Sequence, residues 1–283
     1  MGCRSSPPKW RCSNGWSGRE PRSSRRSARW CADRCAASTA NGQDELTMST
    51  PSRTPLILLP GMPLDAALWA HQTRHLADIA LPMVPVLSGE DSIAAMAARV
   101  LDNAPPRFAV AGLSMGGYVA LEILRRAPER VERLALLDTN ARADTPEQTA
   151  TRREAMALAR QGKYRAVMQA GLARLVHPDR LADRALIDDV LAQMERVGVD
   201  GYLREQTAII TRPDSRPGLS AIACPTLVLC GRQDALTPPV LHAEMAEAIP
   251  GARLVLIEEC GHLSSLEQPV AVTALLRDWL LRP

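Results

Sequence analysis

Residues 112–116 read Gly-Leu-Ser-Met-Gly, a G-x-S-x-G pattern centred on Ser114. A strand-like run at 108–113 precedes the serine, and a helical pattern at 116–127 follows it. In this context the motif makes a sharp turn that lifts the serine hydroxyl out of a sheet. The small residues at 112 and 116 let the neighbouring backbone pass without collision. We therefore predict that Ser114 is a nucleophile, rather than a serine in a chance glycine turn.

A serine hydroxyl is a weak nucleophile until a base takes its proton, and the chain contains five histidines. His262 follows the last strand-like run, so it should lie at the same sheet edge as Ser114. The other four are expected on packed or solvated helix faces or at the surface: His71, His75, His177 and His242. A zinc-protease motif at 71–75 would need glutamate at the second position, where the chain has Gln72. His262 is the predicted base.

A carboxylate must orient the imidazole, and two aspartates are candidates. Asp234 follows the next-to-last strand-like run, and Asp138 follows the run at 134–137. We favour Asp234 because its strand directly precedes the one leading to His262. This choice also keeps the nucleophile, acid, base order of G-x-S-x-G enzymes. Asp138 remains the alternative.

Backbone amides near the nucleophile are candidates for an oxyanion hole. A helix that starts just after Ser114 would point the Met115 N–H at developing negative charge. The second donor is expected from the loop after the first strand, where Met62 is the candidate and a simple proline-glycine turn is the alternative. The residues expected to line an apolar substrate pocket adjoin these positions or lie in the central helical segment: Leu64, Leu236, Leu263, Met168 and Leu172.

Strand-like and helical runs alternate through the chain from residue 53 onward. The expected strands are 56–59, 83–87, 108–113, 134–137, 226–229 and 254–257, and the expected helices are 65–80, 93–103, 116–127, 239–248 and 269–280. Such alternation predicts an α/β fold with a mostly parallel sheet covered by helices on both faces. Ligands then bind at the carboxyl ends of the strands. Six strands are expected, or eight if an additional hairpin precedes them.

The long interval at 141–218 contains only helical patterns. Thr145 and Gln148 form a capping-box signature with proline at the first helical position. An apolar stripe at helical spacing follows at Leu186, Val190, Met194 and Val197. We predict a helical cap at 141–218 above the carboxyl edge of a core made of 48–140 and 219–283. Its apolar residues are expected mainly to pack the cap onto the core.

The basic charge of the chain belongs to its first 47 residues. They carry nine Lys or Arg and four Asp or Glu, whereas the remainder carries 25 and 27, which leaves no electrostatic footprint for nucleic acid. The segment is rich in Arg, Ser and Cys and lacks apolar periodicity. We predict a disordered leader, or an upstream extension with Met48 as the natural start. Its four cysteines match no structural zinc spacing.

The rest of the chain contains three cysteines, Cys224, Cys230 and Cys260, an odd number that favours a reduced, cytoplasmic protein. No apolar run approaches the roughly 20 residues of a membrane helix, so no membrane partner is expected.

From Thr54 onward the chain resembles the α/β-hydrolase superfamily. The segments Gly-Leu-Ser-Met-Gly-Gly at 112–117, Gly-Arg-Gln-Asp-Ala-Leu-Thr-Pro-Pro at 231–239 and Gly-His-Leu-Ser-Ser-Leu-Glu-Gln-Pro at 261–269 are most similar to its carboxylesterase and enol-lactonase branch. The resemblance implies an acyl-enzyme mechanism on Ser114, a small-molecule ester, lactone or thioester substrate, and no cofactor or metal. The branch usually has His-Gly where this chain has Pro60-Gly61, and it commonly begins with a β-hairpin, for which 48–53 is too short.

Several functions remain open from sequence. An acyltransferase or a carbon–carbon hydrolase would use the same three residues. A non-catalytic α/β-hydrolase-like protein would bind a small ligand without turnover. An acyl-carrier protein is a further conceivable partner, although no residue pattern in the chain points to one.

Overall fold

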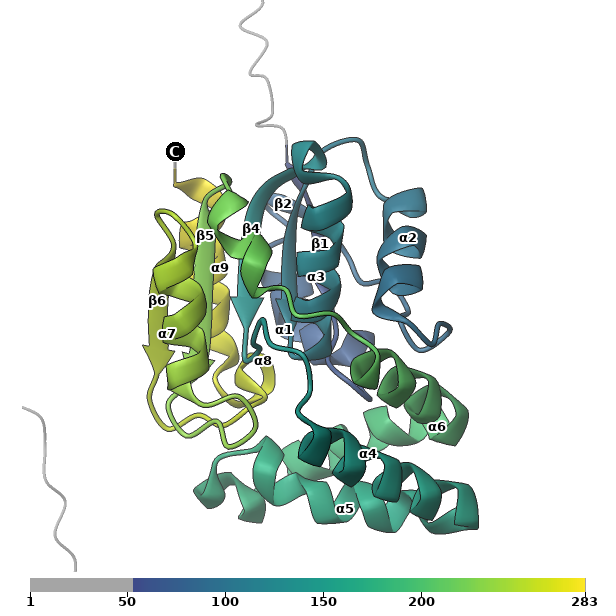
Figure 1. Ribbon diagram of the computed structural model, residues 1–283. Coiled ribbons are helices and arrows are strands. Elements are labelled where there is room, and N and C mark those ends of the chain that lie inside the picture. The colour runs from purple at the N-terminus through teal and green to yellow at the C-terminus, as the bar shows by residue number, and fades with distance from the viewer. Residues whose placement is uncertain (1–52, 283) are drawn as a thin grey trace, which may run out of the picture. The chain divides into compact units, whose positions relative to one another are not determined.

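Parallel strands form one six-stranded sheet in the computed structural model, which describes residues 53–282 (Figure 1). The sheet order is β2-β1-β3-β4-β5-β6, with all neighbouring pairs parallel. The strands are β1 Thr54–Leu59, β2 Ala80–Met83, β3 Phe108–Leu113, β4 Val131–Leu137, β5 Thr226–Gly231 and β6 Arg253–Ile257. The prediction of a six-stranded parallel sheet is confirmed. The leader at 1–47, its cysteines and Met48 lie outside the described residues.

Helices cover both faces of this sheet (Figure 1). The α-helices of the described residues are α1 Ala70–His75, α2 Ile93–Asn103, α3 Met115–Arg126, α4 Pro146–Leu158, α5 Tyr164–Leu175, α6 Arg184–Ile210, α7 Pro239–Ala248, α8 Ser264–Glu267 and α9 Pro269–Leu281, of which α4, α5 and α6 do not lie on a sheet face. Alternate residues of each strand enter two separate cores, because successive side chains of a strand point to opposite faces. Leu58 belongs to the same core as Leu276 of α9, whereas Ile57 belongs to the other core, with Met96 of α2 and Met245 of α7. Among residues 53–282, no helix is long and apolar enough to cross a membrane.

Two expectations at the β2 edge of the sheet were wrong. The predicted helix at 65–80 is a 3₁₀ turn at Ala66–Trp69 followed by the short α1, and the predicted strand at 83–87 lies earlier, at Ala80–Met83. Pairing with β1 joins Thr54 to Ala80 and stops at Met83. Pairing with β1 therefore overrode the local apolar pattern. The apolar run beyond the strand leaves the sheet, and the side chain of Val86 is 68% exposed.

The segment between β4 and β5 is helical and contains α4, α5 and α6. These helices lie beyond the carboxyl ends of the strands, below the arrowheads in Figure 1. The capping box at the start of α4 is present. The backbone N–H of Gln148 donates to Thr145 Oγ1 at 3.2 Å, and the backbone N–H of Thr145 donates to Gln148 Oε1 at 2.9 Å. The long α6 is interrupted at Gly198, which has a non-helical φ of 71°.

The two connections between these helices and the sheet are bonded to each other. The Ser215 amide donates to the Ala141 carbonyl at 2.8 Å, and Arg212 Nε donates to the Arg142 carbonyl at 3.0 Å. Arg212 also pairs with Asp144 at 2.6 Å. The α4–α6 segment thus leaves the core and rejoins it at adjacent positions. We call these two connections, which are hydrogen-bonded to each other, the neck.

Candidate active site

Ser114 stands on the turn between β3 and α3. Its φ of 55° and ψ of −116° lie in a region that non-glycine residues rarely adopt, at a cost on the order of 1–3 kcal/mol. Hydrogen bonds hold this conformation: the Ser114 amide donates to the Leu137 carbonyl at 3.0 Å, and Thr139 Oγ1 donates to the Ser114 carbonyl at 2.7 Å. The neighbouring strand β4 and the residues that follow it therefore fix the position of the serine.

The two glycines of the motif are required by close backbone contacts. A Cβ at Gly112 would lie 2.2 Å from the Gly116 carbonyl oxygen, and a Cβ at Gly116 would lie 2.2 Å from the Leu59 carbonyl oxygen. Both contacts are with backbone atoms, one in α3 and one in β1, which have little freedom to move in the packed interior. The structure thus gives the same reason for these glycines as the sequence pattern.

The structure brings Ser114, His262 and Asp234 together. His262 Nε2 lies 2.9 Å from Ser114 Oγ, and His262 Nδ1 lies 2.8 Å from Asp234 Oδ2. When Nδ1 carries the proton and donates it to Asp234, Nε2 is free to accept the serine proton. Asp234 lies after β5 and His262 after β6, so the carboxyl ends of three strands supply the three side chains.

Asp138 lies close to these residues but makes different contacts. Its Oδ1 accepts from the Gly231 amide at 3.0 Å, and its Oδ2 accepts from the Ser264 amide at 3.1 Å. These bonds connect the segment that carries Asp234 with the segment that carries His262. The contacts therefore favour Asp234 as the group that orients the imidazole, and Asp138 as a brace between the two segments.

The buried charges of the site shift one another's pKa values. Burial opposes charge on Asp234, but His262 and the hydrogen bonds from Thr237 hold the pKa of Asp234 below its usual value. Burial and the neighbouring Asp234 raise the pKa of Asp138 to about 8. The pKa values of the two adjacent carboxyl groups are thus shifted in opposite directions, which favours the anion on Asp234, beside the imidazole.

The pKa of His262 sets the expected acid limb of activity. Burial lowers the pKa of His262, but Asp234 outweighs burial, so the net direction is upward from the usual value near 6.5. Only the neutral imidazole can accept the serine proton, and a raised pKa keeps the ring protonated to higher pH. We expect kcat/KM to rise through an apparent pKa above 6.5, measured on the free enzyme across pH 5–9. A midpoint below 6.5 would contradict this balance of charges.

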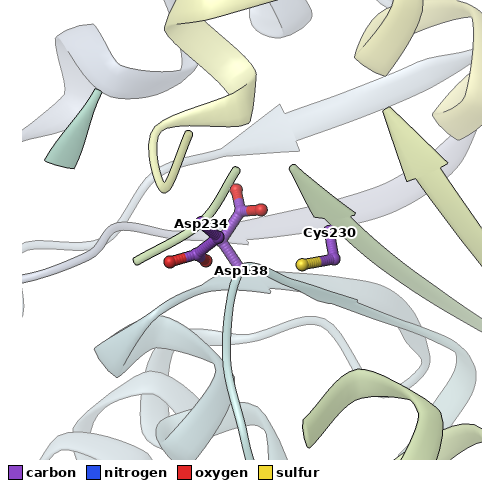
Figure 2. A group of neighbouring side chains, drawn as sticks. All are labelled: Asp138, Cys230 and Asp234. Atoms are coloured by element: carbon purple, nitrogen blue, oxygen red, sulfur yellow. The ribbon is translucent and has the colours of Figure 1, made fainter. Parts of the chain in front are cut away.

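Figure 2 shows Asp138, Asp234 and Cys230, whose ligand-type atoms all lie within 4.8 Å of one another. Both carboxyl groups already accept hydrogen bonds at each oxygen, from the backbone, Thr237 or His262. Burial raises the pKa of the Cys230 thiol, so a thiolate ligand is disfavoured. The hydrogen bonds to Asp138 and Asp234 account for this cluster, and we do not assign it as a metal site.

Both candidate oxyanion donors lie beside the nucleophile. Met115 follows Ser114 at the start of α3, and Met62 lines the same cavity as Ser114, next to Gly61, where an added Cβ would lie 3.2 Å from the Ser114 Cβ. Within the part of the chain that the structure describes, neither the Met62 nor the Met115 amide donates a hydrogen bond. Two backbone donors are thus left for a substrate oxygen, and their catalytic role remains a prediction.

A cavity of about 420 Å³ opens from Ser114 and His262 into the space under α4, α5 and α6. Met168 and Leu236 line it, as predicted from sequence. Three other predicted pocket residues do not line it but pack in the core beneath: Leu64, Leu172 and Leu263. Leu64 and Leu263 were predicted from their adjacency to site residues and Leu172 from its place in the helical segment, and neither criterion fixes the direction of a side chain.

The cavity is also less apolar than expected. Besides Met62, Val167 and Met194, its lining includes five charged residues of the cap and its neck: Asp144, Glu147, Arg152, Arg174 and Arg212. Sequence reasoning missed them because it took the flanks of the catalytic residues as its guide. The only available signal was the set of ionic residues at the start of α4 and after α6, whose proximity depends on the tertiary fold.

The remaining histidines do not reach Ser114. His242 was expected at the surface but is fully buried, and its Nε2 accepts from the Thr139 amide at 2.9 Å. Burial lowers the pKa of His242 to about 4, so the neutral ring serves as a structural acceptor behind the nucleophile turn. His177 is partly buried, and His71 bonds Thr273 at 2.8 Å.

Comparison with known proteins gives concordant matches. The family model described as alpha/beta hydrolase fold matches residues 88–269. A Mycobacterium tuberculosis protein provisionally named non-heme bromoperoxidase BpoC is 34% identical over 187 residues, covering 63% of this chain and 70% of that protein. A Neisseria meningitidis pimeloyl-[acyl-carrier protein] methyl ester esterase is 33% identical over 178 residues, covering 60% and 68%. The solved structure of a thermophilic esterase from Thermogutta terrifontis has a TM-score of 0.75 and 33% identity, covering 82% and 90%.

Proposed function

Because this chain belongs to the alpha/beta hydrolase fold family, we propose that it is a serine hydrolase that cleaves a carboxylic ester of a small to medium acyl group. The esterases among its relatives support hydrolysis of esters in general. The observation that carries the serine mechanism is the continuous chain of contacts from Ser114 through His262 to Asp234. No cofactor or metal enters the proposed reaction.

The proposed reaction has two halves. Ser114 Oγ attacks the ester carbonyl while His262 Nε2 takes its proton, and the Met62 and Met115 amides receive the oxyanion. The carbon–oxygen bond to the alcohol then breaks, and His262 returns the proton to the leaving oxygen. Water attacks the acyl-enzyme with His262 again as base, which releases the carboxylic acid and restores Ser114.

A labelling experiment combined with turnover tests this proposal. A fluorophosphonate probe should modify Ser114, identified by peptide mass spectrometry, and p-nitrophenyl butanoate should be hydrolysed with a steady-state rate. Binding without turnover would favour the non-catalytic alternative. Rapid transfer of the acyl group to an added alcohol or thiol, with little hydrolysis, would instead favour an acyltransferase. Turnover confined to carbon–carbon substrates would favour the third alternative.

The cavity predicts a limit on acyl length. Each buried methylene contributes about 0.8 kcal/mol, so kcat/KM for p-nitrophenyl esters should rise several-fold per carbon until the chain meets the cap. We expect an optimum at roughly four to eight carbons, since the cavity is closed above by cap residues such as Met168. A series from acetate to palmitate measures this. A palmitate optimum or a flat series would contradict the prediction.

Two variants on α5 test where the limit lies. Met168 lines the cavity, whereas Leu172, four residues later, packs in the core. Met168→Ala should therefore move the optimum to longer chains. Leu172→Ala should lower the thermal stability and leave the optimum in place, because it creates a core cavity costing about 2–5 kcal/mol.

A further inference from the structure

We propose that the substrate carries a carboxylate, remote from the scissile ester, that binds between Arg152 and Arg212 under the cap. This inference rests on the proposed function and adds the chemical class of the substrate. It starts from the charged residues that line the cavity on the cap side.

Arg152 and Arg212 share a single carboxylate. Asp144 Oδ1 accepts from Arg212 Nη1 at 2.6 Å, and Asp144 Oδ2 accepts from Arg152 Nε at 2.6 Å. The Asp144 side chain is 1% exposed, and that of Arg212 is 5% exposed. All three residues line the cavity that contains Ser114 and His262. Two guanidinium groups thus face the cavity with one anion between them.

The pair leaves one positive charge without a partner in a largely buried place. Removing such a charge from water is costly unless another anion compensates it. Two further charged residues line the cavity, Arg174 and Glu147, but both are exposed and opposite in sign, so they offset each other. The lining therefore carries one excess positive charge, which matches a monoanionic carboxylate better than a doubly charged phosphate monoester.

Hydrogen-bond donors remain free on both guanidinium groups. Among the described residues, Nη2 of Arg152 and Nη2 of Arg212 donate to no protein acceptor. Two N–H groups on neighbouring planar cations suit the two oxygens of a carboxylate. The free donors and the excess charge point to the same ligand.

The two arginines are held in place before any ligand arrives. Arg212 lies 4.2 Å over the ring of Tyr118 and donates to the Ile209 and Arg142 carbonyls. Arg152 donates to Gln206 Oε1 at 2.9 Å. Tyr118 lies one helical turn after Ser114 and lines the same cavity, so a ligand that reaches the arginine pair remains within the proposed active site. Preorganised donors lose little entropy when a ligand binds.

Matched esters test the inference. Mono-p-nitrophenyl adipate and p-nitrophenyl hexanoate have acyl groups of six carbons and differ in the terminal carboxylate. Wild-type enzyme should prefer the charged ester by about tenfold or more in kcat/KM, because bonds to a charged group are strong. Mono-p-nitrophenyl suberate and p-nitrophenyl octanoate, whose acyl groups have eight carbons, extend the comparison to a longer spacing. Spontaneous hydrolysis is subtracted for each ester.

Arg152→Gln should reduce the preference ratio to about one. The matched control is Arg153→Gln, on the next position of α4, where the side chain is exposed and does not line the cavity; this variant should retain the wild-type ratio. At Arg212 the substitution is Arg212→Lys and not Arg212→Gln, because the guanidinium also donates to the Arg142 and Ile209 carbonyls and so holds the neck of the cap. If Arg152→Gln does not fold, the wild-type ratio still decides the matter: a preference of about tenfold or more for the adipate ester supports the subsite, and a ratio near one overturns it.

The outcomes separate the two proposals. Hydrolysis of hexanoate with no preference for the adipate ester overturns the carboxylate subsite and leaves the serine hydrolase intact. No hydrolysis of any ester overturns the proposed function. In that case titration calorimetry with adipate decides the subsite alone: binding by the wild type that Arg152→Gln abolishes supports it, and no binding by the wild type overturns it.

Discussion

Replacing Ser114 with alanine is expected to lower kcat by about 10⁵–10⁶, because only the oxyanion donors and substrate positioning would remain. The fold should survive, since the strained turn is held by backbone and Thr139 contacts and not by the serine hydroxyl. Circular dichroism and thermal melting check the fold, and p-nitrophenyl ester turnover measures the loss. The exposed Ser220 provides a control, Ser220→Ala, which should retain full activity.

Near-normal turnover by Ser114→Ala would refute the nucleophile assignment. Fluorophosphonate labelling of another serine would refute it independently, because the probe reports the reactive hydroxyl without depending on any substrate.

The second large effect is expected at the acid. Asp234→Asn should lower kcat by about 10⁴, the size seen when a serine protease loses its aspartate, because an asparagine amide no longer enforces the productive tautomer of His262. The acid limb of the pH profile should also move to lower pH, since Asp234 is the main group that raises the pKa of His262. Steady-state kinetics from pH 5 to 9 measure both changes.

Asp138→Asn supplies the comparison. Asp138 accepts from two backbone amides, and an asparagine side chain would leave one of them without an acceptor. The variant should lose about 1–3 kcal/mol of stability, the cost of an unsatisfied buried donor, with a far smaller loss in kcat than Asp234→Asn. If Asp138→Asn instead caused the larger catalytic loss, the acid would have to be reassigned.

Local sequence patterns predicted the helices and strands nearest the proposed catalytic residues. The strand before Ser114 and the glycines around it were evident from sequence, because a sharp turn between a strand and a helix has strict steric demands. The boundaries of β3, α2 and α7 match the predicted ranges, since each is marked by a cap or by proline at its start or by a buried apolar run. The order of strands then implied that His262 and Asp234 approach Ser114 at one sheet edge.

The remainder depends on contacts between distant segments. His242 has no local signal of burial, and its role follows from a bond to Thr139, which lies 103 residues earlier. Among the charged residues that line the cavity, Asp144 accepts a hydrogen bond from Arg212, which lies 68 residues later in the sequence. Likewise, the helix expected at 65–80 ended early because Ala80 pairs with β1. Periodicity along one segment carries no information about such partners.

The closed neck of the cap makes the helical segment a replaceable module. β4 and β5 are neighbours in the sheet, and the chain between them leaves at Ala141 and returns at Ser215, where one hydrogen bond of 2.8 Å joins the two ends. An insertion whose ends meet can be lengthened at little entropic cost, and it can be shortened or exchanged without pulling the sheet apart. The nucleophile, acid and base all lie outside it. New substrate preferences can thus arise in evolution, or be grafted by design, through exchange of the chain between these two residues, while the machinery that breaks the bond stays unchanged.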